Sequence, residues 1–262
     1  MERMVFESED IAHDFEKKNV FGLQSLDVPI YRVFKKFWLT ETIQRKQLTL
    51  QRPAKWHDPF ENYLRSRRVV FYGQSVTIEG FTRRLYGQCW SLCEESDAMW
   101  RIYSPYKESD GVKVKTTARK LFNVLLNIKQ TDAALRYFIG KVDYLEEDEL
   151  ERYFSDADIF KAHLMDATGT GPVVALLKKR KEFEHEKEVR LLYQDAGGEP
   201  NGDRKLFPID PNELFEELVF DPRISEVACA QWKAEFTALG FTNPMHQSGF
   251  YRLGINKPLI LD

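Results

Sequence analysis

The chain has few cysteines and no long apolar run. Its 262 residues include only Cys89, Cys93 and Cys229, an odd number that predicts reduced thiols and a cytoplasmic protein. Cys89 and Cys93 lie four residues apart, but no second Cys or His pair stands at zinc-finger spacing, so we expect no metal site. No apolar segment approaches the roughly 18 residues that a membrane span requires, so we expect no membrane association.

The chain also lacks an excess of charge of one sign. It has 38 Lys and Arg residues against 41 Asp and Glu residues, for a net charge of −3. A dedicated nucleic-acid-binding protein usually has a strong basic excess, so this balance argues against that class. A glycine-rich G-x-G-x-x-G turn is absent as well, which argues against a doubly wound dinucleotide-binding fold.

Aromatic residues are plentiful. The sequence has 19 Phe, 11 Tyr and 5 Trp, and 43% of its residues are hydrophobic, so flat rings build either the core or a binding surface. Short strand patterns alternate irregularly with helical ones, which is typical of an α+β fold. We expect one α+β domain over residues 28–262, and an N-terminal arm or short helix over residues 1–27.

Hydrophobic periodicity and capping residues predict the individual elements. Strands are expected at residues 28–34, 48–50, 86–91, 111–115, 138–145, 206–209, 218–220 and 249–253. The strand at 111–115 alternates with period two and is expected to be half-buried. Helices are expected at residues 39–47 with Thr40 as N-cap, 97–103, 116–128, two between 146 and 181 broken at 168–172, and 225–239.

The most informative segment is acidic and is predicted to be a strand over Glu184–Tyr193. If it is extended throughout, Glu184, Glu186, Glu188 and Arg190 lie on one face, because side chains alternate along a strand. Carboxylates two residues apart repel each other, which raises the pKa of one and equips it for proton transfer. The alternative is an ordinary solvated run of mixed charge.

Two other segments contain chemically useful residues. In the turn Trp56–Glu61, His57 stands beside carboxylates and can serve as a base or ligand or simply be hydrogen-bonded, and Asp58 can hydrogen-bond its own backbone. The five histidines show no metal-ligand spacing. The rings of Gln88–Ser91 and Met99–Tyr103 can stack on a flat cofactor or pack in the core, and Cys89 has no evident His or Asp partner.

Several short motifs follow one another along the chain. They are Tyr31-Arg32, Asp58-Pro59-Phe60-Glu61, Cys89-Trp90-Ser91, Met99-Trp100-x-x-Tyr103 with Gly111-Val112, Glu186-x-Glu188-x-Arg190 and Ser248-x-x-Tyr251. Taken together, these motifs resemble the bacterial domain-of-unknown-function 2971 family (DUF2971), which is similar to abortive-phage-resistance proteins. The resemblance covers residues 28–253, and His57 stands where the family usually has Asn.

The order of Arg, Ser and Glu-x-Glu also resembles, more distantly, that of ADP-ribosyltransferases. That resemblance implies a central split antiparallel or mixed sheet flanked by helices, with NAD bound in the split. It implies that Arg32 pairs with the NAD phosphates and that Ser91 bonds the nicotinamide ribose. Glu188 would stabilise the oxocarbenium-like transition state and Glu186 would orient or deprotonate the acceptor. The rings expected to line the site are Tyr31, Trp90 and Trp100.

The function implied is that of an ADP-ribosyltransferase or NAD glycohydrolase, acting as a toxin or effector in bacterial anti-phage defence. Its acceptor would be a protein or a nucleic acid, and a partner protein would come from the same defence operon. Two alternatives remain open. One is a metal-dependent nuclease that uses Asp58, Glu61 and the glutamate strand, and the other is a non-catalytic sensor or interaction module.

Overall fold

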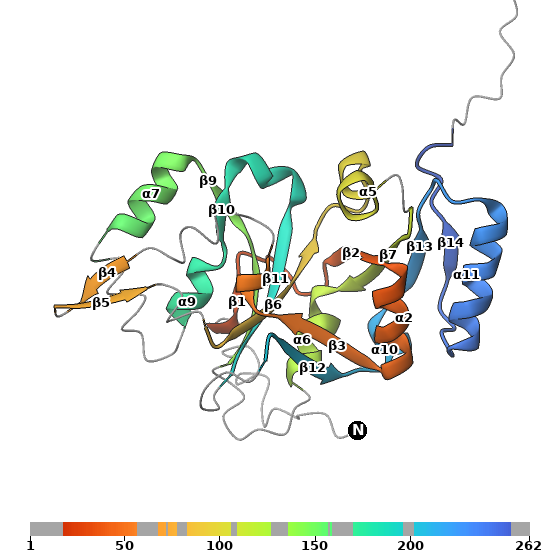
Figure 1. The fold of residues 1–262 in the computed structure, drawn as a ribbon, viewed down its shortest axis with the longest axis horizontal. Coiled ribbons are helices and arrows are strands. Elements are labelled where there is room, and N and C mark those ends of the chain that lie inside the picture. Colours follow the sequence, from red (N-terminus) through yellow and green to blue (C-terminus); the bar gives the residue numbers. More distant parts are fainter. Residues whose placement is uncertain are drawn as a thin grey trace, which may run out of the picture.

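The computed structural model describes residues 18–56, 68–71, 73–77, 83–105, 109–126, 136–156, 158, 170–195 and 202–252. Within these residues, one mixed sheet of ten strands forms the centre of the molecule and helices flank it (Figure 1). Its strands are β1 (Val20–Phe21), β2 (Pro29–Lys35), β3 (Gln47–Gln51), β6 (Leu85–Ser91), β7 (Gly111–Thr117), β8 (Tyr137–Lys141), β11 (Glu188–Gln194), β12 (Arg204–Pro208), β13 (Glu217–Phe220) and β14 (Met245–Gln247).

The remaining elements surround this sheet. Two strand pairs stand apart from it, namely β4 (Arg68–Phe71) with β5 (Gln74–Thr77), and β9 (Asp143–Leu145) with β10 (Lys178–Arg180). The α-helices are α2 (Lys36–Arg45), α5 (Asp97–Tyr103), α6 (Ala118–Leu126), α7 (Glu147–Ser155), α9 (Thr170–Ala175), α10 (Pro211–Leu214) and α11 (Glu226–Ala238), and the 3-10 helices are η1 (Pro53–Lys55) and η3 (Lys181–Glu186).

The strands of the sheet follow the order β1-β8-β11-β6-β2-β7-β13-β14, and β3 joins β12 to β6. The β1–β8 and β13–β14 pairs are parallel and the others are antiparallel. Residues 20–21 therefore belong to the sheet and not to a separate arm. The predicted α+β class, with a mixed central sheet flanked by helices, is confirmed.

The sheet is split beside β6. On one side, β6 pairs with β11 over seven residue pairs. On the other side it meets β2 only at Tyr31 opposite Ser91, and β3 only at Gln51 opposite Gly87. Between these two contacts, over residues 88–90, no described strand pairs with β6 on this side. Side chains can therefore reach the β6 backbone there. This is the split that the resemblance implied.

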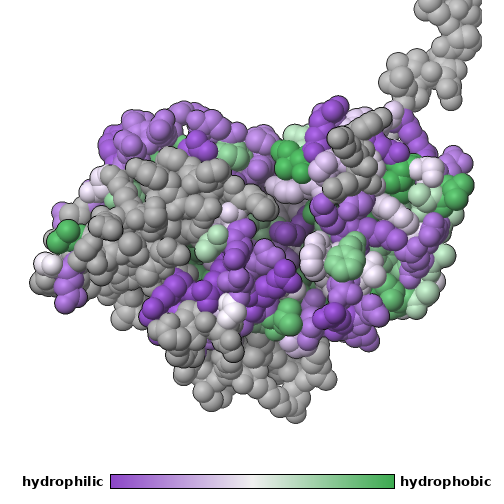
Figure 2. Space-filling view, in the orientation of Figure 1, coloured by the Kyte–Doolittle hydropathy of each residue, from purple (hydrophilic) through white to green (hydrophobic). Residues whose placement is uncertain are grey.

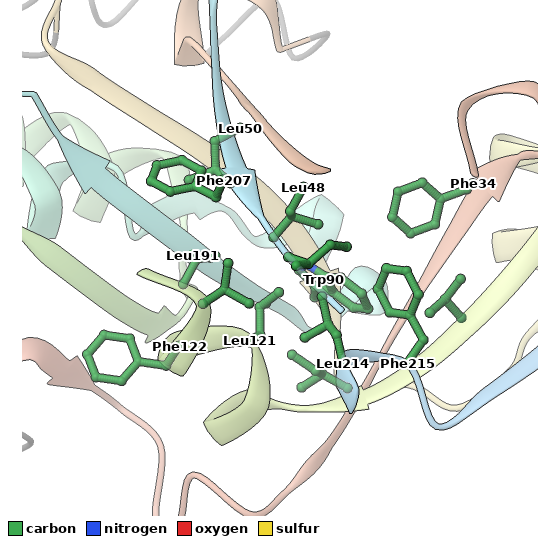
Figure 3. Close-up of a cluster of buried hydrophobic side chains, with 14 of the residues drawn as sticks. Phe34, Leu48, Leu50, Trp90, Leu121, Phe122, Leu191, Phe207, Leu214 and Phe215 are labelled. Carbon is green, nitrogen blue, oxygen red and sulfur yellow. The ribbon is translucent and has the colours of Figure 1, made fainter. Parts of the chain in front are cut away.

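The largest hydrophobic cluster packs against one face of the sheet (Figure 3). From α6 it takes Leu121 and Phe122, as the predicted apolar stripe requires, and from β11 it takes Leu191. The indole of Trp90 meets the ring of Phe34 edge-on, with centroids 6.0 Å apart. Burying each such side chain stabilises the fold by about 1.5–3 kcal/mol. A shift of one residue in the pairing of β6 and β11 would expose these side chains, so their burial fixes the register.

Several predicted boundaries agree with the structure. Ser225 caps α11 by accepting a hydrogen bond from the Ala228 N–H at 3.1 Å. Thr117 likewise accepts one from Lys120 at the start of α6, at 3.2 Å. The predicted strands at 28–34, 48–50, 86–91 and 218–220 correspond to β2, β3, β6 and β13.

Other boundaries were wrong. Helix α2 begins at Lys36 directly after β2, so Thr40 lies inside it and is not its N-cap. The break predicted at 168–172 is where α9 begins, since Pro172 is compatible with the first turn of a helix. The last strand among the described residues is β14, beside β13, and Gly249–Arg252 is not a strand.

The strand at 111–115 was predicted to be half-buried, but the first four residues of β7 are buried, which covers both of its faces there. Val112 and Val114 face the main cluster, and Lys113, only 4% exposed, lies on the opposite face. That face is occupied in part by α5, whose Trp100 is fully buried beside Val33. The predicted alternation of side chains along β7 was therefore correct, but α5 covers part of the face that was expected to be exposed.

The acidic segment is the most important correction. Strand β11 begins only at Glu188, because Lys181–Glu186 forms the 3-10 helix η3 and Lys187 adopts a left-handed conformation with φ of 45°. Glu184 and Glu186 therefore do not share a strand face with Glu188. Any proximity of Glu186 to Glu188 has to come from the turn between η3 and β11.

The close approach of α5 to β7 generates a test. A Cβ atom on Gly111 would lie 2.5 Å from the Ser104 Cβ and 3.1 Å from the Val33 Cγ1, so Gly111→Ala overpacks this contact. We expect a loss of about 1–3 kcal/mol in the free energy of unfolding, measured with urea. Gly249→Ala is the control, since its Cβ would meet nothing within 4 Å. Equal stabilities of the two variants would contradict this packing.

Candidate functional site

The candidate site lies at the split, where the ends of β2, β6 and β11 meet. Ser91 stands opposite both Tyr31 and Glu188 in the strand register. Directly opposite residues of antiparallel strands point to the same side of a sheet, so these three side chains share one face. In the space-filling view the surface is hollowed between the region of α5 and that of β10 and β11, with hydrophilic residues around the hollow (Figure 2).

Arg32 occupies the opening in the sheet. Its Nη1 donates a hydrogen bond to the Cys89 carbonyl, on the part of β6 that neither β2 nor β3 covers. Its guanidinium also lies 5.1 Å from the centroid of the Phe34 ring. Among the described residues no carboxylate forms an ion pair with Arg32, and its buried Nε has no hydrogen-bond partner. Burial lowers the pKa of Arg32, an effect that the nearby Glu188 charge opposes. The site thus contains a cation whose donors are incompletely used.

Glu188 is the most tightly held group of the site. Its carboxylate accepts hydrogen bonds from Arg190 Nε at 2.8 Å and from Lys179 Nζ at 3.2 Å, and its side chain is 8% exposed. Burial by itself raises the pKa of this carboxyl. The charges of Arg190 and Lys179 outweigh that effect and lower it to about 2, so Glu188 is a fixed negative charge at neutral pH.

Arg190 is fully committed to this arrangement. It is 1% exposed, pairs with Glu188 at 2.7 Å and donates a second hydrogen bond to the Leu176 carbonyl. Its guanidinium also lies 4.6 Å from the centroid of the Trp56 ring. Arg190 is therefore a structural counter-ion for Glu188 and has little freedom to bind a ligand.

Glu186 differs from Glu188 in its electrostatics. It comes from η3, its side chain is 13% exposed, and its carboxylate accepts a hydrogen bond from Lys179 Nζ at 2.6 Å. Burial and the negative charge of Glu188 raise its pKa, and Lys179 opposes that rise. Two neighbouring carboxyls with pKa values pushed apart can divide the roles of fixed charge and proton acceptor between them.

Tyr103 stands near these groups from the opposite side of the hollow. It is the last residue of α5, and the residue is 41% exposed. Burial and the negative charges of Glu186 and Glu188 raise the pKa of its hydroxyl. A half-exposed ring with a desolvated hydroxyl fits a side chain whose polar end is turned towards the glutamates.

Ser91 is used by the backbone around it. Its hydroxyl donates a hydrogen bond to the Glu186 carbonyl at 2.6 Å and accepts one from the Cys93 N–H at 2.9 Å. The first of these bonds ties the end of β6 to η3 and so helps to place Glu186. The hydrogen bond predicted from Ser91 to a ribose stays a prediction.

The three rings expected to stack on a ligand lie elsewhere or are covered. Trp90 is 2% exposed, packs in the main cluster and donates its indole N–H to the Gln88 side chain at 2.8 Å. Trp100 is fully buried and donates to Glu95 at 2.7 Å. Tyr31 shares the face of the site but is only 6% exposed. Buried indoles cannot present a flat face to a ligand, so the stacking role expected for Trp90 and Trp100 finds no support.

Lys179 and Tyr144 were not predicted from the sequence as site residues, and Tyr103 was predicted only as a ring that can stack on a flat cofactor or pack in the core. Lys179 looked like one more residue of the basic run Lys178–Lys181, and only the fold shows that it is buried. Tyr144 reaches the site through its hydroxyl, which accepts a hydrogen bond from the Glu188 N–H at 2.8 Å. No local pattern marks either residue, because both are brought in by the β9–β10 pair.

The turn containing His57, Asp58 and Glu61 lies outside the described residues. Within the part of the chain that the structure does describe, no group of three or more His, Cys, Asp and Glu side chains is placed to hold a metal ion. In the same part, none of the helices has the length and apolar character needed to span a bilayer.

Fold and site together define an α+β protein with one buried and one partly exposed glutamate at the split of its sheet. The family model described as Protein of unknown function (DUF2971) matches residues 99–191. This stretch begins in α5 and ends in β11, so it includes Tyr103, Lys179 and both glutamates. The resemblance to this family predicted from the sequence is confirmed over these residues. No curated protein matches the chain.

Solved structures of DarT from Thermus sp. 2.9 are similar to the chain at low identity. DarT in complex with ADP-ribosylated ssDNA is 13% identical with a TM-score of 0.40, over 84% of this chain and 93% of that chain. DarT in complex with NAD+ is 12% identical with a TM-score of 0.40, over 88% and 100%. DarT in complex with carba-NAD+ is 14% identical with a TM-score of 0.37, over 85% and 96%.

The buried charges predict an acid-sensitive fold. The lowered pKa of Glu188 means that its ion pairs stabilise the folded state above pH 4.5, and that this contribution is lost as the pH falls towards 2. Glu186 acts in the opposite sense, because its raised pKa favours proton uptake by the folded state. We expect Glu188→Gln to flatten the loss of stability between pH 4.5 and 2, measured by urea unfolding.

At neutral pH the same variant should be less stable by about 3–5 kcal/mol, since Lys179 and Arg190 lose their shared partner. Glu151→Gln is the control, because Glu151 is exposed, and it should change neither quantity. An unchanged pH profile in Glu188→Gln would contradict the ion-pair arrangement.

Proposed function

We propose that the chain is an NAD-using enzyme that transfers ADP-ribose to an acceptor, or to water, at the split of the sheet. The observation that carries this proposal is the position of Arg32. It is a cation inside the split with an unused buried Nε and no carboxylate partner among the described residues, next to a pair of glutamates. A ligand with a phosphate group and a reacting sugar would pair its phosphate with Arg32 and its sugar with the glutamates.

Arg32 is suited to the diphosphate of NAD. A guanidinium presents several N–H donors in one plane and matches the geometry of phosphate oxygens. One of its donors is used by the Cys89 carbonyl, which fixes the orientation of the group. The buried Nε has no other use among the described residues, and a phosphate oxygen would supply its missing acceptor.

Glu188 is suited to the reacting ribose. When the bond between the ribose and nicotinamide breaks, its electron pair leaves with nicotinamide and positive charge develops on the sugar. A preorganised negative charge stabilises such a transition state because it needs no rearrangement. Glu188 meets this requirement, since Lys179 and Arg190 keep it ionised and in one place.

Glu186 is suited to the acceptor. Its raised pKa makes it a better proton acceptor than Glu188, and its side chain is the more exposed of the two. In the proposed reaction it takes the proton from the nucleophile that forms the new bond to the ribose. With water as the nucleophile, the same steps give an NAD glycohydrolase. We place the enzyme, on the sequence resemblance alone, as an effector of anti-phage defence with a partner protein from its operon.

Purified protein incubated with NAD, with cell lysate, RNA or DNA as acceptor, should release nicotinamide. We expect Glu186→Gln to lower the rate by about 10²–10⁴-fold, the usual contribution of a positioned general base. Arg32→Lys keeps the charge but loses the guanidinium geometry, so the KM for NAD should rise. Glu151→Gln should behave like the wild type.

Absence of nicotinamide release with every acceptor would contradict the proposal. Metal-dependent cleavage of RNA or DNA that is lost in Asp58→Ala would instead support the nuclease alternative.

A further inference from the structure

The small β9–β10 pair holds Glu188 at two points. Tyr144 of β9 and Lys179 of β10 are direct partners in the parallel register of this pair. The Tyr144 hydroxyl accepts a hydrogen bond from the Glu188 N–H at 2.8 Å, and Lys179 Nζ donates to the Glu188 carboxylate at 3.2 Å. The Glu188 carbonyl also accepts a bond from the Val142 N–H, just before β9, at 2.9 Å. The backbone and the side chain of one glutamate are therefore both fixed by this pair.

Lys179 also holds Glu186. Its Nζ donates to the Glu186 carboxylate at 2.6 Å, so a single ammonium group lies between the two carboxylates. Its side chain is 6% exposed, and Nζ lies 4.5 Å from the centroid of the Phe183 ring of η3. No other cation among the described residues contacts the Glu186 carboxylate. Lys179 is thus the residue through which the position of Glu186 depends on the β9–β10 pair.

We infer that Lys179 is a positioning residue, which holds the Glu186 carboxylate against Glu188 and keeps it ionised so that it can accept a proton from the acceptor. This inference rests on the proposed function for its catalytic consequence. It adds a residue from outside the large sheet to the site, and assigns the β9–β10 pair the role of a clamp on the two glutamates.

The electrostatics of the site give the physical reason. Without Lys179, two carboxylates in contact repel each other in a poorly solvated site, and the one that lacks a second counter-ion takes up a proton. Glu188 would retain Arg190, whereas Glu186 would retain no cation. Glu186 would then be protonated at a higher pH and could no longer serve as a base near neutrality.

The other charged and titratable groups around the pair do not replace Lys179. From β11 the neighbour is Arg190, which is bound to Glu188 and to the Leu176 carbonyl. From β9 it is Tyr144, and from α5 it is Tyr103, both neutral near pH 7 as ordinary phenols are, and burial raises their pKa values further. From β2 it is Arg32, whose charge acts on Glu188.

The test compares Lys179→Met with Lys179→Arg and with Lys178→Met. Lys178 is the matched control, because it lies on the same strand and pairs with Asp143 instead of the glutamates. The first readout is the protonation of Glu186, followed by carboxyl ¹³C NMR on protein labelled at Glu. In Lys179→Met we expect its titration midpoint to rise by about one pH unit or more, a tenfold change in proton affinity. In Lys178→Met it should stay unchanged.

The second readout is the rate of nicotinamide release as a function of pH. In Lys179→Met the acid limb of the profile should move to higher pH with the Glu186 titration. The kcat at pH 7 should fall about tenfold or more while the KM for NAD stays nearly constant, since a base is lost and a binding group is not. Lys179→Arg should restore most of kcat, because it restores the cation. A merely structural lysine would lower stability without moving the acid limb.

An unchanged Glu186 titration in Lys179→Met would overturn the inference, as would an unchanged pH profile in an active enzyme. If Lys179→Met does not fold, Lys179→Arg decides the question, because a wild-type Glu186 titration with this cation supports the inference and a raised one refutes it. The titration needs no turnover. An inactive wild type would therefore contradict the proposed function, whereas the NMR titration would still test whether Lys179 controls the protonation of Glu186.

Discussion

A negative charge that is withdrawn from water governs the arrangement of this protein's candidate site. The carboxylate of Glu188 is almost fully buried, and an isolated buried carboxylate would cost many kcal/mol. It persists because Arg190 and Lys179 each supply a donor at hydrogen-bond distance. The strand that carries Glu188, the short pair that carries Lys179 and the helix that carries Glu186 therefore have to assemble in one arrangement.

The split of the sheet has a second physical consequence. The β6 backbone between its contacts with β2 and β3 needs hydrogen-bond partners, since buried backbone groups are rarely left unpaired. The Arg32 guanidinium supplies one to the Cys89 carbonyl of β6, and on the β3 side the Gln88 side-chain amide donates to the Thr49 carbonyl of β3 at 3.1 Å. An arginine is thus held in the interior for structural reasons, while its buried Nε has no hydrogen-bond partner among the described residues and its charge interacts with that of Glu188. One side chain serves both the fold and the proposed chemistry.

The sequence predicted those parts of the structure that depend on local patterns. The β-branched and aromatic residues of Val28–Phe34 and the apolar stripe of α6 indicated elements that the structure contains, and the helix predicted over residues 225–239 corresponds to α11. The acidic strand was wrong at its start because Lys187 adopts a left-handed conformation, which no period-two pattern reveals. The burial of Trp90 and Trp100 also escaped prediction, since a sequence shows a ring but not which side of a sheet is covered.

The site residues likewise divide into those that residue type and order predicted and those that depend on tertiary contacts. Glu186, Glu188 and Arg32 were singled out by type and order, and the structure brings them to one region. Lys179 and Tyr144 were missed because their roles come from the register of two strands far apart in sequence. Buried counter-ions of this kind are long-range properties of a fold. They become visible only when the tertiary contacts are known.

The pairing of β6 also constrains how the chain acquires its structure. The long partner of β6 is β11, and its two other contacts are single residue pairs with β2 and β3. During synthesis β6 is made well before residues 188–194. The edge of β6 that pairs with β11 therefore stays unpaired until β11 has been synthesised. Topologies with such distant pairings fold slowly and leave strand edges exposed in the meantime. The glutamate at the start of β11 therefore joins the site only after β2 and β6 have been synthesised, and a chain that ends before β11 has neither a complete sheet nor a site.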